Sequence, residues 1–595
     1  MRWRYALVIG SVSAIAVLGV SAVALTRVAV TRTATSRPVA TGTRSVPPAM
    51  PFRVAKATSK TTLALSAAKV VYGHEQSERL SVRVLPRYSG TPGGNVTVEA
   101  GSAGVCNITL KSGAGSCTLA AGALGVGTSY LTAVYVGNPD FGGSASARVA
   151  LTVVSGSACS HSAPPFCWPT SVSINGRSLL DQTGHPYMIV GDSPHSLIVN
   201  LTEAEANTYF ADRQAHGFNA AWVEILCNGY TGGSASGETY DGLAPFLTSQ
   251  AFSAPPWAFS APNPAYFKRV DDMVKLAAQH GITVFLDPAD TGGWMGPIES
   301  NGPTTDFNYG VYLGNRYKSF PNVVWINAND FQTWNNATDD ADVSAIAKGI
   351  ASVDHNHLQT VELNYDASSS LDDAKTWASI IKLNLAYTYH PTYGEVLHAY
   401  NQAPTTPTFM GEANYEFENN TAANPPSTYV LRLQEYWTMT SGATGQLYGN
   451  HYTWDDGTNW TDEKTHLDTA GVQQLQYMSA LFDRLPWQNL VPDQSHAFVT
   501  EGYGTPSTGG ALAESNYVTA AFDPDGTTGV AYLPRASTIT INMNKMKAAV
   551  TGRWYDPTTG TYTTIGTFAN SGTHQFMSPG PHSDGNDDWV LLLQS

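Results

Sequence analysis

The sequence predicts a multidomain protein in which a (β/α)8 TIM barrel is flanked by an N-terminal immunoglobulin-like β-sandwich and a C-terminal β-sandwich. Three observations predict this fold class. The chain has 595 residues, which is too long for a single hydrophobic core. Residues 171–487 alternate apolar strand-like runs with helical patterns, as repeated βα units do. Residues 58–155 and 488–595 instead contain short alternating strands separated by turn residues.

Eight strand-like runs between residues 171 and 487 predict the eight strands of the barrel. Helical patterns fit between these runs. Thr202 and Glu205 have the spacing of a capping box, and Asn263 precedes a proline at the first position of another helix. Eight βα units in about 300 residues match the usual size of a TIM barrel. The runs begin at Tyr187, Asn219, Ile282, Val323, Leu358, Leu383, Pro407 and Gly445.

The N-terminus has the features of a secretory signal peptide or a membrane anchor, which we assign to residues 1–26. Arg2 and Arg4 precede an uncharged stretch that contains the small-residue pattern ending at Ala24, which is typical of a cleavage site. The stretch is also long enough to remain as an anchor. Residues 27–57 are rich in Thr, Ser, Ala, Pro and Arg, which predicts a flexible linker. We therefore expect a secreted or cell-surface-anchored protein that contacts a membrane only if this segment is uncleaved.

The five cysteines agree with export to an oxidising compartment. Cys106 and Cys117 flank a short polar loop, and Cys159 and Cys167 close a proline-containing linker within residues 156–170. We expect a local disulfide bond in each pair, Cys106–Cys117 and Cys159–Cys167. Cys227 is left over and matches no metal-binding or redox spacing, so we expect a buried thiol there.

The charge and the motifs of the chain exclude several classes of partner. The formal net charge of −15 argues against nucleic acid and against an anionic membrane, which both need clustered positive charge. The sequence contains no His-Glu-x-x-His zinc helix, no Gly-Lys-Ser/Thr phosphate loop and no Gly-x-Ser-x-Gly elbow. We therefore expect neither a metal nor a cofactor. The 14 Trp and 29 Tyr residues offer flat apolar faces, which suit sugar rings and protein cores alike.

The predicted strand ends carry the candidate catalytic residues, because TIM-barrel active sites lie at the C-terminal ends of the strands. Asp330 follows strand four and Glu412 follows strand seven, so the two carboxylates can face each other across the barrel. Two facing carboxylates are what glycoside hydrolysis requires, one to protonate the leaving oxygen and one to attack or to activate water. The other candidates at strand ends are Asp192, His195, Glu224, Asp287, Asn329, His390, His451 and Trp454.

The order of these residues resembles a known family. An acid/base after strand four and a nucleophilic glutamate after strand seven is the arrangement of the large clan of retaining (β/α)8 glycosidases. Residues 171–487 more specifically resemble the apiosidase-like catalytic domain, through "YLGNRYKSFPNVVWINAND", "MGEANYEF" and "YWTMTSGATGQLYGNHYTW". Residues 488–595 resemble a collagen-binding-type module through "GVAYLP" and "RWYDPTTG", and "LTAVYVGNPDFGGSASA" resembles bacterial immunoglobulin-like repeats.

The resemblance implies a secreted glycoside hydrolase that releases the branched pentose apiose from pectic rhamnogalacturonan, a plant cell-wall polysaccharide. It implies that Asp330 is the acid/base and Glu412 the nucleophile, with Glu416 as an alternative nucleophile. Glycines commonly precede the acid in this family, whereas this chain has Ala328 and Asn329, and this departure bears on which sugar is bound. Substrate contacts are expected from Asp192, His195, Glu224, Asn329, His390, Glu416, His451 and Trp454.

Other interpretations remain open from the sequence alone. An arabinofuranosidase or another pentosidase fits the same motifs, and a non-catalytic carbohydrate-binding surface adhesin fits the two flanking β domains. Asp330 could cap a helix. Asp192 and His195 could form structural pairs within the loop after the first strand rather than bind sugar. Trp454 could close the top of the barrel. Trp294 lies in a glycine-rich segment, where a cleft residue and a buried residue are equally compatible with the sequence.

Overall fold

The structure is a computed structural model that describes residues 56–595, apart from residues 74, 102, 121, 155–158, 248–257, 365–366, 419–425 and 456–459. The signal peptide or anchor predicted for residues 1–26 and nearly all of the predicted linker lie outside the described residues. Among the helices of the described part, none has the length and apolar character needed to cross a bilayer.

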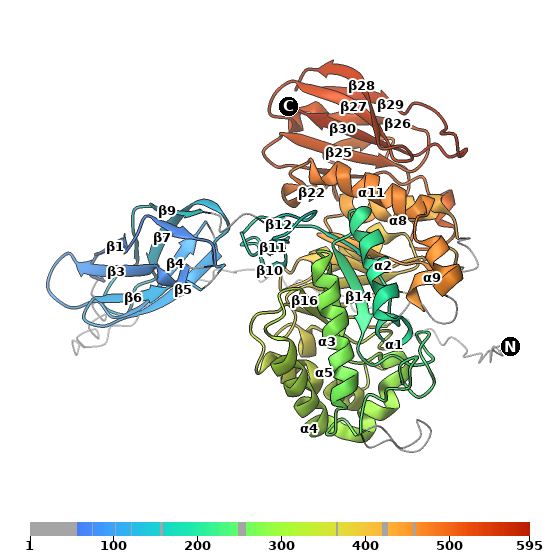
Figure 1. The fold of residues 1–595 in the computed structure, drawn as a ribbon. Helices are drawn as coiled ribbons and strands as arrows, with labels where there is room; N and C mark the ends of the chain where they lie inside the picture. Colours follow the sequence, from blue (N-terminus) through green and yellow to red (C-terminus); the bar gives the residue numbers. More distant parts are fainter. Residues whose placement is uncertain are drawn as a thin grey trace, which may run out of the picture. The chain divides into compact units, whose positions relative to one another are not determined.

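The first described domain is a β-sandwich, as its alternating strands predict (Figure 1). One sheet has the strand order β1-β3-β6, and the other has the order β2-β9-β7-β4-β5 with β8 paired to β7. In β3, Leu80, Val82 and Val84 are buried between exposed neighbours, so one face of the strand builds the core. The strands are β1 (Ser59–Leu65), β2 (Lys69–Val71), β3 (Arg79–Pro86), β4 (Gly94–Ala100), β5 (Ala103–Leu110), β6 (Ala114–Thr118), β7 (Gly127–Tyr135), β8 (Ser144–Ala145) and β9 (Val149–Val154).

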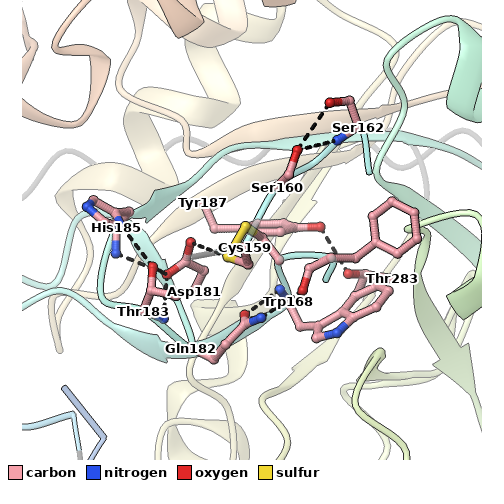
Figure 2. The surroundings of a disulfide bond; sticks show 12 residues. Cys159, Ser160, Ser162, Trp168, Asp181, Gln182, Thr183, His185, Tyr187 and Thr283 are labelled. Atoms are coloured by element: carbon pink, nitrogen blue, oxygen red, sulfur yellow. Dashed lines mark hydrogen bonds between the residues drawn. A yellow bond between two sulfur atoms is a disulfide. The ribbon is translucent and has the colours of Figure 1, made fainter. Parts of the chain in front are cut away.

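Both predicted disulfide bonds are present in the structure. Cys106–Cys117 joins β5 to β6. Cys159–Cys167 lies beside a small sheet made of β10 (Pro169–Val172), β11 (Leu179–Asp181) and β12 (Pro186–Tyr187). Figure 2 shows Asp181 next to the disulfide, with its Oδ2 atom 3.4 Å from the Cys159 sulfur. These contacts order the segment that precedes the first barrel strand.

The central domain is a curled, mostly parallel sheet of the TIM-barrel type with helices on its outer side (Figure 1). Eight parallel strands follow the order β17-β16-β15-β14-β13-β21-β20-β19, and each lies within one of the eight predicted runs. The strands are β13 (Ile189–Asp192), β14 (Ala220–Glu224), β15 (Thr283–Asp287), β16 (Val323–Asn327), β17 (Gln359–Val361), β19 (Asn384–Thr388), β20 (Thr408–Glu412) and β21 (Gly445–Tyr448).

The barrel closes without a ladder of hydrogen bonds between the described strands β17 and β19, the two strands at the ends of this order. A short additional strand, β18 (Ala367–Ser369), pairs antiparallel with β19, and the described strands β17 and β19 share no ladder. The Ser370 hydroxyl spans this gap, because it donates to the Val361 carbonyl at 2.6 Å and accepts from the Leu385 N–H at 2.9 Å. A backbone hydrogen bond from Lys382 to Gln359, 2.9 Å long, adds to this contact.

Side chains fill the interior of the barrel, because successive strand residues point alternately inward and outward. In β14, Trp222 packs inside with Phe285 and Phe409, whereas Val223 packs outside against the helices. All these side chains are buried. Space for a ligand is therefore expected at the strand ends rather than along the barrel axis.

The helices begin where the sequence signals predict. The capping box of α2 (Glu203–Ala215) is formed, with Thr202 Oγ1 accepting from Glu205 N at 3.2 Å and Glu205 Oε2 accepting from Thr202 N at 2.8 Å. The Asn263 side chain caps α3 (Pro264–Gln279). The other helices of this domain are α1 (Leu197–Asn200), α4 (Thr291–Tyr317), α5 (Ala337–Ala351), α6 (Ala374–Trp377), α7 (Thr392–Asn401), α8 (Thr428–Thr440), α9 (His451–Trp454), α10 (Trp460–Glu463) and α11 (Ala470–Asp483).

The glycine-rich segment after β15 is the start of α4 and carries Trp294, which is fully buried rather than a cleft residue. A Cβ atom on Gly292 would lie 2.1 Å from the Tyr230 ring, and one on Gly293 would lie 2.1 Å from Asn228. These glycines therefore allow the β14 loop to approach α4 closely. They do not indicate a flexible loop.

The C-terminal domain contains two antiparallel sheets, as predicted. Their strand orders are β22-β24-β25-β30-β27-β28 and β23-β26-β29. Ile539, Ile541, Trp554 and Leu591 are part of the buried core of this domain. The strands are β22 (Val491–Pro492), β23 (Val499–Glu501), β24 (Thr519–Phe522), β25 (Thr528–Leu533), β26 (Thr538–Asn542), β27 (Val550–Asp556), β28 (Thr561–Phe568), β29 (Thr573–Met577) and β30 (Trp589–Gln594).

Candidate active site

A cavity of about 160 Å³ lies at the C-terminal ends of the barrel strands. Its wall is built by β20 and by the segments that follow β13, β14, β16, β19, β20 and β21. The structure brings together five residues that the sequence predicted for the site, namely His195, Asn329, Asp330, Glu412 and Trp454. The remaining lining residues are Tyr230, Thr231, Tyr389, Tyr415 and Glu418.

Asp330 is positioned by an unusual backbone after β16. Ala328 and Asp330 have φ angles of 73° and 47°, in the left-handed region that non-glycine residues rarely adopt. The Asp330 N–H donates to Glu362 Oε2 at 2.9 Å, and the Tyr230 hydroxyl donates to Asp330 Oδ2 at 2.7 Å. The turn thus directs the carboxylate of Asp330 into the cavity, where Tyr230 holds it.

Glu412 is the last residue of β20 and is held by two tyrosines. The Tyr389 hydroxyl donates to Glu412 Oε1 at 2.6 Å, and the Tyr415 hydroxyl donates to Oε2 at 3.1 Å. The side chain is buried, with 7% of the residue exposed. Both oxygens are therefore oriented, and hydrogen bonds of this kind favour the ionised carboxylate.

Both acids have a raised pKa. Burial is the main cause that raises the pKa of Glu412, to about 8, and the Asp330 charge adds to it, while the tyrosine hydrogen bonds act in the opposite direction. Burial also raises the pKa of Asp330, against the hydrogen bonds from Tyr230 and Tyr387. Two neighbouring carboxylates of this kind hold one shared proton near neutral pH, which is the state that an acid and a nucleophile need.

Glu362 is a further buried carboxylate close to the two acids. It follows β17, is completely buried, and binds the Asp330 N–H. Burial and the charges of Glu412 and Asp330 raise the pKa of Glu362 well above its usual range. Its protonated form can therefore support the Asp330 turn without adding a third negative charge to the site.

His195 belongs to a buried chain that ends at Glu412. Its Nε2 atom is 3.3 Å from the Tyr415 hydroxyl, and its Nδ1 atom is 3.5 Å from Glu224 Oε1. Burial lowers the pKa of His195 to about 3, so the ring is neutral. Burial and the Asp290 and Asp287 charges raise the pKa of Glu224 well above its usual range. Glu224 therefore lies behind His195, and the described cavity wall does not include it.

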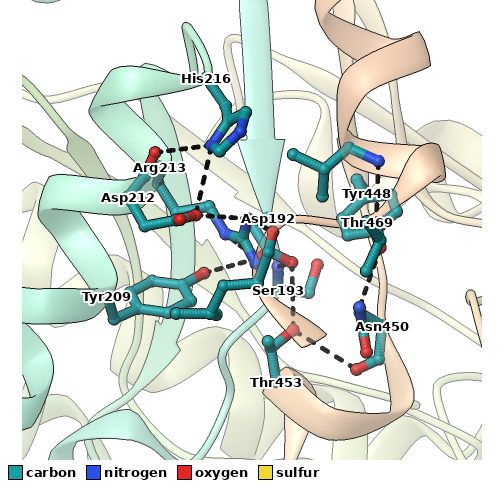
Figure 3. Close-up of polar contacts among 12 residues, drawn as sticks. Asp192, Ser193, Tyr209, Asp212, Arg213, His216, Tyr448, Asn450, Thr453 and Thr469 are labelled. Atoms are coloured by element: carbon teal, nitrogen blue, oxygen red, sulfur yellow. Dashed lines mark hydrogen bonds and ion pairs between the residues drawn. The ribbon is translucent and has the colours of Figure 1, made fainter. Parts of the chain in front are cut away.

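Asp192 lies in a structural network outside the cavity wall. Figure 3 shows its carboxylate between Tyr209 and Arg213, and both donate to Oδ2 at 2.7 Å. The Ser193 N–H donates to Oδ1 at 2.8 Å. Asp192 and Arg213 are both buried, so this ion pair fixes α2 to the end of β13. The geometry favours the structural interpretation of Asp192 over a contact with sugar.

Three other predicted residues also lie away from the described cavity wall. Glu416 is buried and accepts hydrogen bonds from Tyr448, from Thr469 at 2.7 Å and from the Gly471 N–H at 3.3 Å. It therefore orients the loop around β21 and is a poor candidate for the nucleophile. His390 and His451 follow β19 and β21, and neither lines the cavity.

Sequence reasoning missed the tyrosines that orient the two acids. Tyr389 immediately follows the sixth strand, and Tyr415 lies within the quoted segment "MGEANYEF". Their positions near strand ends could therefore have marked both tyrosines as site residues. Glu362 similarly follows the fifth strand. Tyr230 lies in a long loop 100 residues before Asp330, and no pattern in the sequence connects the two.

Potential metal ligands lie elsewhere. Among the described residues, Asp372, Glu395 and His398 bring ligand atoms within 4.8 Å of one another. Asp372 Oδ1 is already 2.7 Å from His398 Nε2 and accepts from Gln402 at 2.7 Å, so hydrogen bonds satisfy this oxygen. None of these residues lines the cavity, and the carboxylate pair above provides acid–base chemistry by itself.

Comparisons with known proteins agree with the fold. Residues 173–489 match the family described as "Apiosidase-like, catalytic domain". Residues 508–594 match "Putative collagen-binding domain of a collagenase", and residues 62–154 match "Bacterial Ig-like domain (group 3)". No functionally curated protein matches the chain in sequence.

Two solved structures share the fold. One is described as a glycoside hydrolase and is 21% identical, with a TM-score of 0.58 over 72% of this chain and 97% of that chain. The other is a glycoside hydrolase family 5 protein from Bacteroides vulgatus, 19% identical, with a TM-score of 0.58 over 72% of this chain and 93% of that chain. At these identities the likeness concerns the fold.

Proposed function

The chain belongs to the apiosidase-like family of glycoside hydrolases, and from this premise we propose that it is a secreted retaining furanosidase that releases a pentose such as apiose from pectic polysaccharide. The observation that carries the proposal is the pair Asp330 and Glu412, which reach one cavity from β16 and β20. The cavity volume of about 160 Å³ suits one small sugar residue and is below the range of pockets for drug-sized ligands.

In the first step, Glu412 attacks the anomeric carbon while protonated Asp330 donates its proton to the glycosidic oxygen. The bond between the anomeric carbon and that oxygen breaks, and a covalent glycosyl-enzyme forms on Glu412. The hydrogen bonds from Tyr389 and Tyr415 favour the ionised form of the attacking carboxylate. The first step starts from the form in which Asp330 carries the proton of the pair and Glu412 is ionised, which is the less populated form below the Glu412 pKa of about 8.

In the second step, Asp330 is ionised and acts as a base. It removes a proton from water, which attacks the anomeric carbon, displaces Glu412 and releases the sugar with retained configuration. Loss of the Glu412 charge in the intermediate lowers the pKa of Asp330, because one like charge has disappeared. The coupling between the acids thus suits both roles of Asp330.

Substitution of the two acids tests the proposal. We expect Asp330→Asn and Glu412→Gln each to lower kcat/KM at least about 1,000-fold on an apiose-containing pectic oligosaccharide, because each removes a group that takes part in bond breaking. Released sugar is measured by chromatography. Glu203→Gln, which changes an exposed carboxylate of α2, serves as the matched control and should retain wild-type activity.

Two readouts separate the parts of the proposal. In Glu412→Ala, added sodium azide should restore turnover and give a glycosyl azide of inverted configuration, because azide occupies the place of the missing nucleophile. Proton NMR of the first product of the wild-type enzyme should show retention. Near wild-type activity in both acid variants would refute the assignment of the catalytic pair, and cleavage of other pentosides alone would refute the choice of apiose.

A further inference from the structure

A group of exposed and half-buried aromatic rings lies beside the cavity, and we call it the rim cluster. It consists of Phe417, Tyr452 and His466. Tyr452 and His466 stack with ring centroids 3.6 Å apart, and Phe417 contacts them edge-on at 5.5 and 5.4 Å. Phe417 remains 42% exposed. The cluster is therefore ordered by its own contacts and still offers an apolar surface to solvent.

Backbone hydrogen bonds build the rim cluster from two segments that are distant in sequence. The Glu416 N–H donates to the Gly449 carbonyl, and the His451 N–H donates to the Glu416 carbonyl, both at 2.9 Å. Phe417 follows with a φ angle of 63°, which is a genuine outlier for a large side chain. Phe417 thus combines a strained backbone with an exposed aromatic ring, and strained backbone is common at binding sites.

The rim cluster is continuous with the cavity wall. Glu418 and Trp454 both line the cavity, and the Trp454 indole N–H donates to Glu418 Oε2 at 2.7 Å. His451 Nδ1 is 3.5 Å from the same Glu418 oxygen, and the His451 ring contacts Tyr452 at 5.3 Å. A surface therefore runs from Trp454 through Glu418 and His451 to Phe417.

We propose that the rim cluster binds the sugar residue next to the one held in the cavity. This inference rests on the proposed function of the cavity. Sugar rings have one face of C–H groups, which packs on aromatic rings, and equatorial hydroxyls, which bind charged side chains. Phe417 supplies the apolar face, and Glu418 and His451 supply the polar partners.

The inference can be tested by comparing two substrates. A methyl apiofuranoside occupies the cavity and carries no group that reaches the rim cluster, whereas an oligosaccharide from apiose-containing pectin extends beyond the cavity. In Phe417→Ala, we expect the ratio of kcat/KM for the oligosaccharide to kcat/KM for the methyl glycoside to fall about tenfold, the effect of one lost aromatic contact. Phe307→Ala, which removes another exposed phenylalanine on α4, is the matched control and should leave the ratio unchanged.

Binding measurements keep the test independent of catalysis. In the inactive Glu412→Gln background, calorimetric titration with the oligosaccharide should give a Kd about tenfold higher when Phe417 is also replaced by alanine. An unchanged ratio and an unchanged Kd would overturn the inference, as would an equal loss on both substrates, which indicates a structural role. If the wild-type protein cleaves neither substrate, the proposed function fails, and the titration alone decides whether Phe417 contacts a saccharide.

Discussion

Glu412 occupies a buried position in which its ionised form is unfavourable for folding. It is buried with Asp330 and Glu362 nearby, and the described structure places no lysine or arginine in the cavity wall. Ionising an acid in such surroundings is unfavourable, which is why its pKa rises. Tyrosine hydrogen bonds offset only part of that cost. Such residues are typical of active sites, where stability is lost to gain function.

The pH dependence of stability follows from the raised pKa of Glu412. The folded value of about 8 exceeds the usual value of 4.5, so its contribution to stability is complete below pH 4.5 and is lost as the pH rises towards 8. Glutamine cannot ionise and still accepts from the tyrosines. We therefore expect Glu412→Gln to gain about 1–3 kcal/mol in free energy of unfolding over wild type between pH 5 and pH 8.

Urea denaturation at a series of pH values measures this difference. Glu203→Gln, whose carboxylate is exposed, should show no such trend. A difference between Glu412→Gln and wild type that stays constant from pH 5 to pH 8 would contradict the raised pKa.

The position of a residue along a strand predicts its place at the barrel rim but not the direction of its side chain. His195, Asn329, Asp330, Glu412 and Trp454 do line the cavity. Asp192 and Glu416 do not, because buried hydrogen bonds hold their carboxylates away from the cavity. Asp192 binds Arg213 of α2, and Glu416 binds Thr469, which precedes α11. Both partners are distant in sequence, so no local pattern predicts these contacts.

At the scale of elements, the regular parts of the barrel were predictable and its irregular parts were not. Alternating apolar runs and capping signals identify each parallel strand and the starts of α2 and α3. The glycines around Trp294 were compatible with both a cleft residue and a buried residue, since glycine permits a flexible as well as a closely packed backbone. The structure uses Gly292 for close packing against Tyr230, which in turn binds Asp330. Whether a glycine gives flexibility or close packing depends on tertiary contacts, which the local sequence does not show.

The Ser370 hydroxyl is the element-scale feature with the clearest energetic consequence. It joins β17 to β19 where the described strands share no ladder, and it is buried. Ser370→Ala would leave the Val361 carbonyl and the Leu385 N–H without this partner. We expect a loss of about 2–4 kcal/mol in the free energy of unfolding, because unsatisfied buried groups cost about 1–3 kcal/mol each.

Chemical denaturation of Ser370→Ala measures the loss. Ser352→Ala removes a hydroxyl whose 2.7 Å hydrogen bond stays within its own helix turn, so this control should lose much less stability. Equal losses in the two variants would show that the Ser370 bridge does not join the strands.

At the scale of the whole molecule, the hydrophobic pattern of the sequence identifies the domains but does not predict the contacts between them. Strand-only segments and βα segments differ in hydrophobic period, so the order sandwich, barrel, sandwich is readable. Arg432 of α8 and Asp588 before β30 are 156 residues apart, yet their side chains form two hydrogen bonds of 3.1 and 2.8 Å. Charge patterns along the chain give no indication of this pairing.

The Arg432–Asp588 pair makes a prediction about how the barrel and the C-terminal domain unfold. Both side chains are completely buried, and Tyr532 also donates to Asp588 at 3.0 Å. Asp588→Leu leaves the Arg432 charge buried with the half-exposed Asp584 as its ion-pair partner among the described residues, so we expect a loss of about 3–5 kcal/mol. The double variant Arg432→Met with Asp588→Leu should recover most of this loss, because no buried charge remains unpaired. Calorimetry and urea denaturation of the full chain measure the three variants against wild type, and additive losses in the double variant would show that the pair is not coupled.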